Sequence, residues 1–583
     1  MKHAVRIVAL LLSTVMLIST LASCKNDSLS SSTDDPNLSS ESTENTSQPT
    51  DSITDNPTDT EETAPEEEEN YIFETVYPPV SVSSLKFTLT DNMLTEYEKK
   101  IIEAKRLFDN EKTSEDKFRN ALYEILSLRA EIETQCDIAY LQYYYDMSDS
   151  DAWDNYLYAY DLLDEAKDLF WEFYNESKNE ENKLANVFIE VVQKEYKGNL
   201  VTPISSTDSY AYDMERLEGQ YNSLKNSNAS DEEIFAVYKK YLTAANGLAV
   251  ASSTKNYYEY ACRYIYYRND TAAQREELRK YVKEHLIPLC RALREKSWDL
   301  DGSLSQSDLD LSNKYLYDKY DSFDENYLFD YFSSLTASSG EAMTDAFEKD
   351  RVLIGNKDDS YNSAMVSVVG NTPICYFHED QTDLETMAHE LGHYYAWFVG
   401  DSTYFSTDLR ETQSTANSML LYSYLSDTLD SPAFKSSELY SVYNWMYQII
   451  LSVIKDEFDE IIYTHSPSAL TLEDFERIMS DLIYEYNVRD LSSNITNQLM
   501  TYWRRLGITY PMSNYCYATA MITAFQIYTK SKDDYTAATE IYRRIVEEPQ
   551  NEGDFVSTII NAGLTTPYDK QTYIELKKLL EIN

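Results

Sequence analysis

Basic residues, glycine and paired cysteines are scarce in this 583-residue sequence, and each scarcity argues against a class of protein. Lys and Arg total 50 against 100 Asp and Glu, which gives a net charge of −50. Because such a surface repels phosphate backbones and anionic lipid headgroups, we expect no nucleic-acid partner. Only 12 glycines are present, which argues against a turn-rich β-sandwich or propeller and favours long helices.

Cysteine is also rare, and its placement excludes two kinds of site. Five cysteines follow Cys24, and none of them belongs to a Cys-x-x-Cys pair. An odd number of unpaired cysteines predicts neither a disulfide framework nor a thiolate zinc cluster. We expect each of them to be a small buried residue. They are Cys136, Cys262, Cys290, Cys375 and Cys516.

The N-terminal residues have the pattern of a targeting signal rather than of a part of the fold. Lys2 and Arg6 precede a short apolar run, residues 7–21, that is too short to span a bilayer comfortably. The run ends in Leu-Ala-Ser-Cys at residues 21–24, which resembles the lipobox of bacterial lipoproteins. That resemblance implies a signal peptide over residues 1–23, a lipid on Cys24, and a protein held outside the cell membrane through that lipid alone.

Residues 24–70 follow as a tether rich in Ser, Thr, Pro and acidic residues. Such a composition cannot bury enough apolar surface to offset the entropy of ordering, so we expect disorder. No later segment has 18 consecutive apolar residues. We therefore predict no transmembrane helix in the rest of the chain.

From about Leu94 onward, apolar residues recur every three to four positions with few helix breakers. This pattern predicts a mainly α protein, with an N-terminal helical domain over residues 71–340 and a catalytic region over residues 341–583. The 52 tyrosines follow these helical patterns, which indicates core and rim packing rather than a sugar-binding platform. One segment, residues 363–377, is β-prone and broken by Gly370-Asn371, so it predicts two short strands around a turn. The strands could hold an extended peptide or be purely structural, and the sequence leaves both roles open.

The stretch TMAHELGHYY carries the chemistry. His389 and His393 lie one helical turn apart, so both imidazoles can reach one metal ion. Glu390 lies beside the ion rather than on it, in position to take a proton from a metal-activated water. Residues 382–385 have the form of a capping box, and Gly400 is typical of a C-terminal cap.

A catalytic zinc needs a third ligand, and the next helix offers one. Polar residues follow Gly400, and a helix restarts near Thr407 or Asp408, which places Glu411 in its first turn or so. We favour Glu411 as the ligand over a second helix cap, with Asp408 and Asp401 as weaker substitutes. Glu385 could either orient the His389 ring or serve as a cap.

At this point the residues resemble a known family. Residues 383–393, DLETMAHELGH, are similar to the active-site helix of the oligoendopeptidase F and thimet-type zinc peptidases. Residues 411–415, ETQST, match the family's Glu-x-x-Ser-Thr segment. The resemblance implies one zinc ion held by His389, His393 and Glu411, with Glu390 as the general base.

A second segment extends the resemblance toward the C-terminus. Tyr510 and residues 515–519, YCYAT, are similar to the family's tyrosine-rich segment, from which a phenol stabilises the oxyanion. The first choice for this phenol is Tyr517 and the second is Tyr510, with Tyr515 expected to contact the substrate. Residues 281–295 and 561–567 also resemble the family, so the likeness covers roughly residue 281 to the C-terminus.

The chain departs from the family pattern in three places. The 18 positions from His393 to Glu411 are several fewer than the family spacing implies, and Ser418 stands where an acid is common. A histidine usual before the tyrosine segment is absent, since the nearest earlier one is His465 in a turn-like context. These departures bear on substrate handling more than on metal binding.

The leading expectation is a zinc-dependent endopeptidase of short peptides. The resemblance implies a helical shell around a deep substrate channel, with the small sheet beside the active-site helix and the protein acting as a monomer. One alternative is a metallocarboxypeptidase that uses Arg504 or Arg505 to hold the terminal carboxylate of its substrate. The other alternative is an inactive lipoprotein that captures peptides without cleaving them.

Overall fold

The computed structural model describes most of the chain from residue 72 onward. The described residues are 72–195, 205–225, 229–317, 326–355, 360–361, 363–400, 405–505, 507–508, 511–550 and 553–582. The signal peptide, Cys24 and the tether predicted for residues 1–70 lie outside them.

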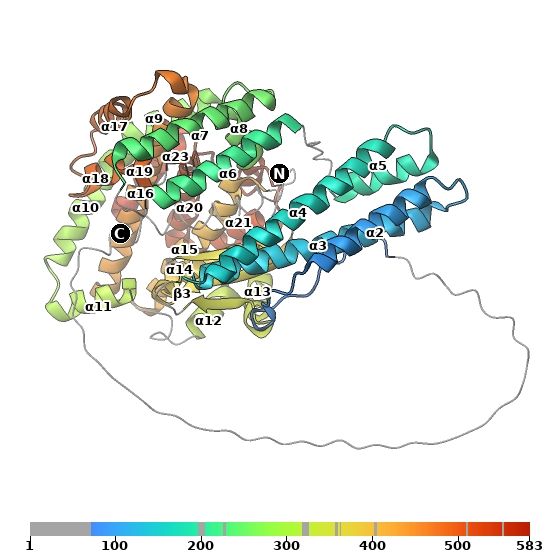
Figure 1. Ribbon diagram of the computed structural model, residues 1–583. Coiled ribbons are helices and arrows are strands. Elements are labelled where there is room, and N and C mark those ends of the chain that lie inside the picture. The colour runs from blue at the N-terminus through green and yellow to red at the C-terminus, as the bar shows by residue number, and fades with distance from the viewer. Residues whose placement is uncertain are drawn as a thin grey trace, which may run out of the picture.

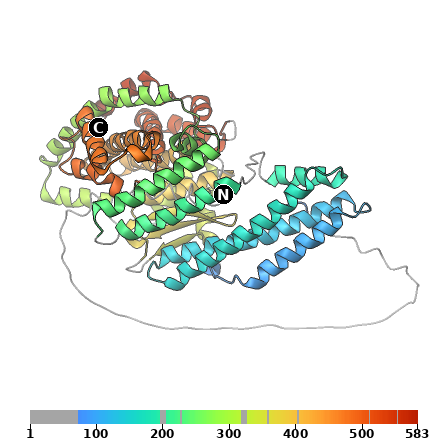
Figure 2. The same cartoon turned by 45° about the horizontal axis from the view of Figure 1, so that its top comes forward.

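Four helices form an arm, residues 72–195, that projects from the rest of the molecule (Figures 1 and 2). They are α2 (Asp91–Phe108), α3 (Glu115–Tyr145), α4 (Ser150–Ser177) and α5 (Lys183–Glu195). Ser114 starts α3 as its N-cap by accepting a hydrogen bond from Lys117 N at 3.2 Å. The arm has its own core, in which the rings of Phe118 and Phe173 both pack against Phe188, at centroid distances of 5.9 and 4.8 Å. Apolar residues at helical spacing bury one stripe of each helix, which accounts for this bundle.

The remaining helices form the body, residues 205–582. Those before the sheet are α6 (Ser205–Lys225), α7 (Asp231–Ala251), α8 (Tyr257–Tyr260), α9 (Ala272–Tyr281), α10 (Ile287–Asp301), α11 (Gln306–Tyr317), α12 (Asn326–Leu335) and α13 (Ala337–Glu348), with π-helical turns η2 (Ala261–Ile265) and η3 (Val282–Leu286). Those after it are α14 (Leu384–Val399), α15 (Thr407–Thr428), α16 (Pro432–Thr464), α17 (Leu472–Tyr486), α18 (Ile495–Met500), α19 (Tyr502–Arg505), α20 (Asn514–Asp533), α21 (Tyr535–Glu547), α22 (Phe555–Asn561), α23 (Lys570–Leu576) and α24 (Leu579–Ile582). Within the body, α15 packs between α14 and α20. The predicted mainly α class is confirmed.

A three-stranded sheet lies where the arm meets the body (Figure 1). Its order is β1 (Val352–Gly355), β3 (Thr372–His378) and β2 (Ala364–Val369), with β1 parallel and β2 antiparallel to β3. The predicted strand pair is therefore confirmed, and its turn contains Gly370 at a φ of 62°, a conformation that glycine adopts without strain. The parallel strand β1 was not predicted.

Alternate residues of the sheet face the arm and the body. Ile374 and Tyr376 of β3 pack with Ile138 of α3, whereas Cys375 and Phe377 join the core that contains α14. This period of two is the geometry of a strand buried on both faces. The sheet therefore holds α14 on one face against an arm helix on the other.

Separate hydrophobic clusters form the cores of the arm and the body. One cluster belongs to the arm and ends at Val192, while the large body cluster begins at Met214 and continues past residue 341 to Leu579. Residues of α6 to α13 belong to or pack against the same cluster as the helices that follow the sheet. The predicted division of the chain at residue 340 stays a prediction.

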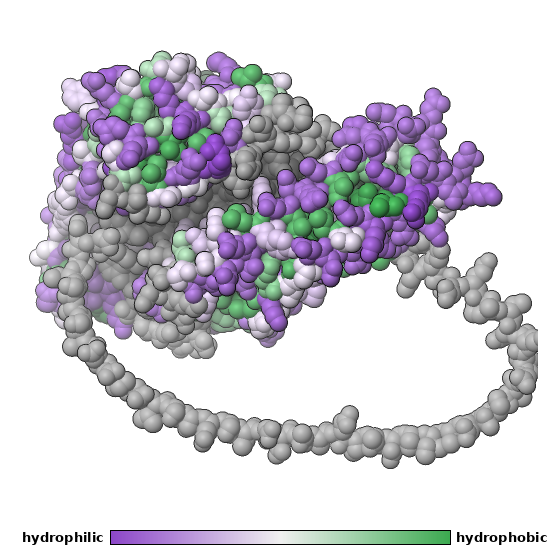
Figure 3. All heavy atoms as spheres, in the orientation of Figure 1, coloured by the Kyte–Doolittle hydropathy of each residue, from purple (hydrophilic) through white to green (hydrophobic). Residues whose placement is uncertain are grey.

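Hydrophilic side chains cover most of the arm in the view of Figure 3, as the excess of acidic residues predicts. Among the described residues, no helix combines the length and apolarity needed to cross a membrane. The five cysteines after Cys24 are all buried, which confirms the prediction made for them, and none of the five forms a disulfide.

Candidate active site

The histidines lie on α14, whose start differs from the predicted one. Asp383 is the N-cap, and its carboxylate accepts a hydrogen bond from Thr386 N at 3.0 Å. The predicted capping box at residues 382–385 is therefore wrong by one residue. The carboxylate of Glu385 accepts from Tyr422 Oη and Trp445 Nε1, each at 2.7 Å. It does not orient the His389 ring, since neither nitrogen of that ring makes a hydrogen bond within the described residues. Gly400 ends the helix, as predicted, in an extended conformation.

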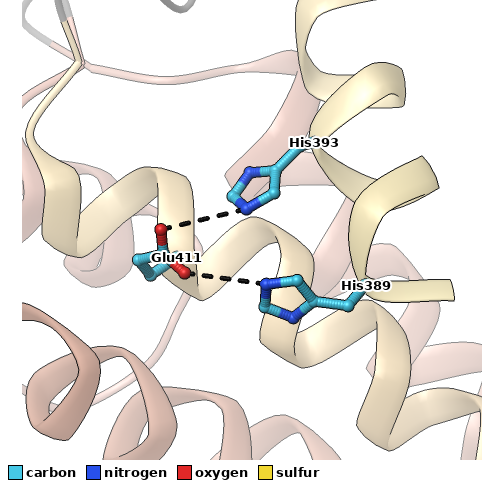
Figure 4. A group of neighbouring side chains, drawn as sticks. All are labelled: His389, His393 and Glu411. Carbon is cyan, nitrogen blue, oxygen red and sulfur yellow. Dashed lines mark ion pairs between the residues drawn. The ribbon is translucent and has the colours of Figure 1, made fainter. Parts of the chain in front are cut away.

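The structure brings His389, His393 and Glu411 together (Figure 4). Nε2 of His389 lies 3.7 Å from Glu411 Oε2, and Nε2 of His393 lies 3.8 Å from Glu411 Oε1. One ligand atom from each residue falls within 4.8 Å of the other two. Ligands about 2.0 Å from a tetrahedral zinc lie roughly 3.3 Å apart, so small side-chain movements would seat an ion among these three.

A glycine allows α15 to approach the histidine helix closely. A Cβ atom added at Gly392 would lie 3.0 Å from Ser414 Cα and 3.0 Å from Asn417 Nδ2, both on α15. Asn417 Nδ2 also donates to Ala388 O at 2.9 Å, which ties the two helices together. Glu411, which lies one turn before Ser414, is thereby held opposite the histidine rings.

The state of the imidazoles fits a metal. His389 is 2% exposed, and neither its Nε2 nor that of His393 makes a hydrogen bond within the described residues. Burial lowers the pKa of His389 to about 3. Burial, His389 and Arg410 lower the pKa of His393 well below its usual value. Both rings are therefore neutral at physiological pH, which is the form that binds zinc, and a metal would satisfy their unbonded nitrogens.

Glu390 directly follows His389 on α14. It is 1% exposed, and its Oε2 accepts no hydrogen bond from the part of the chain that the structure describes. Burial raises the pKa of Glu390 well above its usual value. A buried carboxyl with a raised pKa can accept and release a proton near neutral pH, which suits a general base.

Of the three predicted tyrosines, two lie on α20 and one cannot be placed. Tyr517 is buried, and the charges of Glu411 and Glu390 add to the effect of burial in raising its pKa well above the usual value. Its phenol therefore keeps its proton and can donate a hydrogen bond near the site. Tyr515 is also buried, with its ring centroid 4.0 Å from the guanidinium carbon of Arg268. Its contact with substrate stays a prediction, and Tyr510 lies outside the described residues.

The weaker substitutes for Glu411 and the other histidines lie elsewhere. Asp408 is buried on α15 but accepts from the hydroxyl of Thr519, and Asp401 lies outside the described residues. His285 packs against Tyr573, and Nδ1 of His465 lies 2.5 Å from Ile461 O. Neither histidine belongs to the metal-binding group.

The sequence analysis did not predict the burial of two arginines near the site. Arg410 precedes Glu411 directly and donates from Nη2 to Thr407 Oγ1 at 2.9 Å, and Arg268 lies beside Asp408. A basic residue in the polar segment TDLRETQST reads as a surface residue, so the sequence carried no signal that Arg410 is buried. A separate surface cavity near Tyr145, Asp149 and Leu353 is lined by no predicted site residue.

Known proteins resemble this chain in structure rather than in sequence. No family model matches the chain, and no curated protein sequence matches it. Solved structures do. One named PZ peptidase A, with an inhibitor, superposes with a TM-score of 0.64 at 15% identity, covering 86% of this chain and 99% of that one.

Two further structures carry the name oligoendopeptidase F. The first superposes with a TM-score of 0.65 at 15% identity and covers 86% of this chain and 98% of its own. The chain has the fold of oligoendopeptidase F. The second, from Bacillus anthracis str. Ames, superposes with a TM-score of 0.60 at 14% identity over 86% of this chain and 97% of that one. The oligoendopeptidase F fold thus extends through the arm, well beyond the region in which the sequence resembled the family.

Proposed function

We propose that this protein is a zinc-dependent endopeptidase that hydrolyses short peptides. The observation that carries the proposal is the position of the Glu411 carboxylate, 3.7 and 3.8 Å from the Nε2 atoms of two neutral imidazoles. The fold of oligoendopeptidase F supports the same activity.

Each side chain has a role in this proposal. His389, His393 and Glu411 would hold one zinc ion. When bound, zinc polarises the scissile carbonyl and lowers the pKa of water, which favours attack. Glu390 accepts the proton from the attacking water and passes it to the leaving amine. Tyr517 donates a hydrogen bond to the carbonyl oxygen as negative charge develops on it.

The position of strand β2 supports a peptide as the substrate. The strand lies at the edge of the sheet and packs against α14, and only one of its sides pairs with a strand among the described residues. An extended peptide could add to the other side through main-chain hydrogen bonds. Such binding depends little on sequence, which suits an enzyme for mixed short peptides. The deep channel implied by the resemblance stays a prediction.

The carboxypeptidase alternative loses one of its candidates. Arg504 donates to Ala229 O at 3.0 Å and forms an ion pair with Asp231, so its guanidinium is engaged at the start of α7. An endopeptidase needs no such group, because it does not bind a free terminal carboxylate.

The experiment that tests the proposal combines zinc analysis with blocked peptides. We expect one zinc per chain, and internal cleavage of peptides that are blocked at both ends. Glu390→Gln should keep the zinc and lose about 10²- to 10⁴-fold in kcat. Glu379→Gln, at an exposed position just before α14, is the matched control and should cleave normally. Cleavage confined to peptides with a free C-terminus would favour the carboxypeptidase, and zinc binding without any cleavage would favour the peptide-binding lipoprotein.

We also propose that a lipid on Cys24 holds the enzyme outside the cell membrane. The N-terminal sequence supports this through its apolar run and the Leu-Ala-Ser-Cys that ends it. Cys24→Ser should release the protein from the membrane fraction without changing its peptidase activity. Retention of this variant in the membrane would contradict the anchor.

A further inference from the structure

A buried arginine contacts α15 one turn before Glu411. Arg268 follows the π-helical turn η2, and its backbone N–H donates to Cys262 O at 2.8 Å. Its Nε lies 2.8 Å from Asp270 Oδ1 and 4.0 Å from Asp408 Oδ2. The side chains of Arg268 and Asp408 are 1% and 3% exposed, so water does not screen this interaction strongly.

The same loop is tied to both helices of the site. Tyr266 O accepts a hydrogen bond from Thr407 N, the first residue of α15, at 3.0 Å. On α20, the hydroxyl of Thr519 donates to Asp408 Oδ1, and the ring of Tyr515 stacks on the Arg268 guanidinium. Arg268 therefore lies at the junction of the loop, the helix of Glu411 and the helix of Tyr517.

The helical spacing connects this junction to the metal-binding group. Asp408 and Glu411 are three residues apart at the start of α15, so they lie on neighbouring positions of one face. A rotation or shift of this first turn would move both carboxylates together. The contacts of Asp408 with Arg268 and Thr519 oppose such a movement.

Burial of the Arg268 guanidinium costs free energy. Nη1 and Nη2 of Arg268 make no hydrogen bond within the described residues, although the side chain is buried. A buried ion pair contributes less to stability than well-packed apolar side chains in place of both partners, although removal of one partner alone is destabilising. The position of Arg268 beside the first turn of α15 indicates that this arginine serves to orient that turn.

We propose that Arg268 is a positioning residue, which fixes the carboxylate of Glu411 opposite the two imidazoles through Asp408. The inference rests on the metal site of the proposed function but not on peptide cleavage. Arginine suits the role because its planar guanidinium can stack on Tyr515 and approach two carboxylates at once, which a lysine ammonium cannot do in the same way.

The body offers a matched control in a second buried arginine. Arg279 pairs with Asp456 at 2.9 Å and with Glu460 at 2.6 Å, and it has no ion pair with α15 among the described residues. It joins the same ionic cluster, since Arg275 bridges Glu460 and Asp270. Loss of Arg279 should therefore loosen the body as much as loss of Arg268 without acting on Glu411.

The test measures metal binding in the full chain, with zinc and cobalt as probes. Arg268→Met should weaken zinc affinity about 10- to 100-fold, as loss of a residue that orients a ligand typically does. It should also shift the visible absorption bands of the cobalt-loaded protein, which report the arrangement of the ligands. Arg268→Lys should recover only part of the affinity. Arg279→Met should lower thermal stability but leave affinity and spectrum unchanged.

A milder variant guards against misfolding of the arginine variants. Thr519→Val removes the hydroxyl that donates to Asp408 while keeping the size of the side chain, so we expect a smaller loss of zinc affinity in the same direction. Equal losses in Arg268→Met and Arg279→Met would assign the effect to general loosening and overturn the inference. Unchanged affinity and spectrum in both Arg268→Met and Thr519→Val would also overturn it. A wild type that binds zinc but cleaves no peptide would refute the endopeptidase alone.

Discussion

The arm and α15 bury their side chains in opposite ways. In the arm, the buried residues are mainly apolar or aromatic and recur at helical spacing, as in the cluster around Phe118 and Phe188. In α15, every residue from Thr407 to Tyr422 is buried, and most of them are polar or charged. Three charged residues lie within four positions there, Asp408, Arg410 and Glu411, and each is 5% exposed or less.

The difference separates what a fold needs from what a reaction needs. Burial of apolar side chains stabilises a helix bundle, whereas burial of polar groups costs free energy unless each is bonded. The arm can be understood from stability alone. Under the proposed function, a metal site and the contacts that orient it account for the polar core around α15. Substitutions in the two regions should therefore have opposite effects on stability and on metal binding.

The largest expected effect is loss of the metal. Structural zinc sites bind with about 10–16 kcal/mol shared among their ligands, so His389→Ala should weaken zinc affinity by about 10²- to 10³-fold or more. The metal-free variant should unfold at or above the temperature of the metal-free wild type, because a buried imidazole whose nitrogens make no hydrogen bond has been removed. Zinc titration and thermal unfolding check both points. His285→Ala is the control, and a similar loss of zinc there would contradict the assigned site.

In the arm, we expect a substitution to lower stability without changing zinc affinity. Phe118→Ala empties a fully buried position, so the free energy of unfolding should fall by about 3–5 kcal/mol. Zinc affinity of the folded protein should stay within about twofold, because Phe118 belongs to the separate arm cluster. Denaturant unfolding and zinc titration provide the measurements. Phe73→Ala, at a position 43% exposed, should change neither quantity by much.

Glu390 predicts a pH effect on the metal-free protein. Burial raises its folded-state pKa well above the usual value, so its stabilising contribution is present below about pH 4.5 and is lost as pH rises toward the raised pKa. Glu390→Gln removes this loss. Its stability relative to wild type should therefore grow by up to about 1.4 kcal/mol per pH unit above pH 4.5. Unfolding at several pH values checks this, and a flat difference would show that Glu390 ionises normally.

The smallest effect concerns the contact between α14 and α15. Gly392→Ala would place a Cβ 3.0 Å from Ser414 Cα, so the helices must separate by a few tenths of an ångström. Such overpacking costs about 1–3 kcal/mol, and the longer distance to Glu411 should weaken zinc binding by about tenfold. Gly219→Ala on α6 has no atom within 4 Å of the new Cβ and serves as the control. Unchanged zinc affinity in Gly392→Ala would mean that Glu411 can follow the moving histidines.

Much of the site could be predicted because its signals are local. The spacing of His389 and His393, the strands around Gly370 and the restart of the helix at Thr407 are each set by neighbouring residues, and the structure has all three. The predicted N-cap of α14 was wrong because residues 382 and 383 can both cap a helix. Only the fold selects Asp383.

The rest depends on contacts between distant residues. Strand β1 is four residues long and pairs in parallel with β3, an arrangement that no short pattern signals. The segment TDLRETQST reads as an exposed helix, so nothing in it revealed the burial of Arg410. The ion-pair partner of Asp408 is Arg268, which lies 140 positions earlier in the chain.

The reactivity of the five buried thiols can report which part of the molecule opens first. Cys136 lies in the arm and Cys375 in the sheet, while Cys262, Cys290 and Cys516 lie in the body. A thiol reagent can modify each one only when its surroundings open. The order in which these five positions react would thus show whether the arm unfolds before the candidate active site, without any engineered label in the chain.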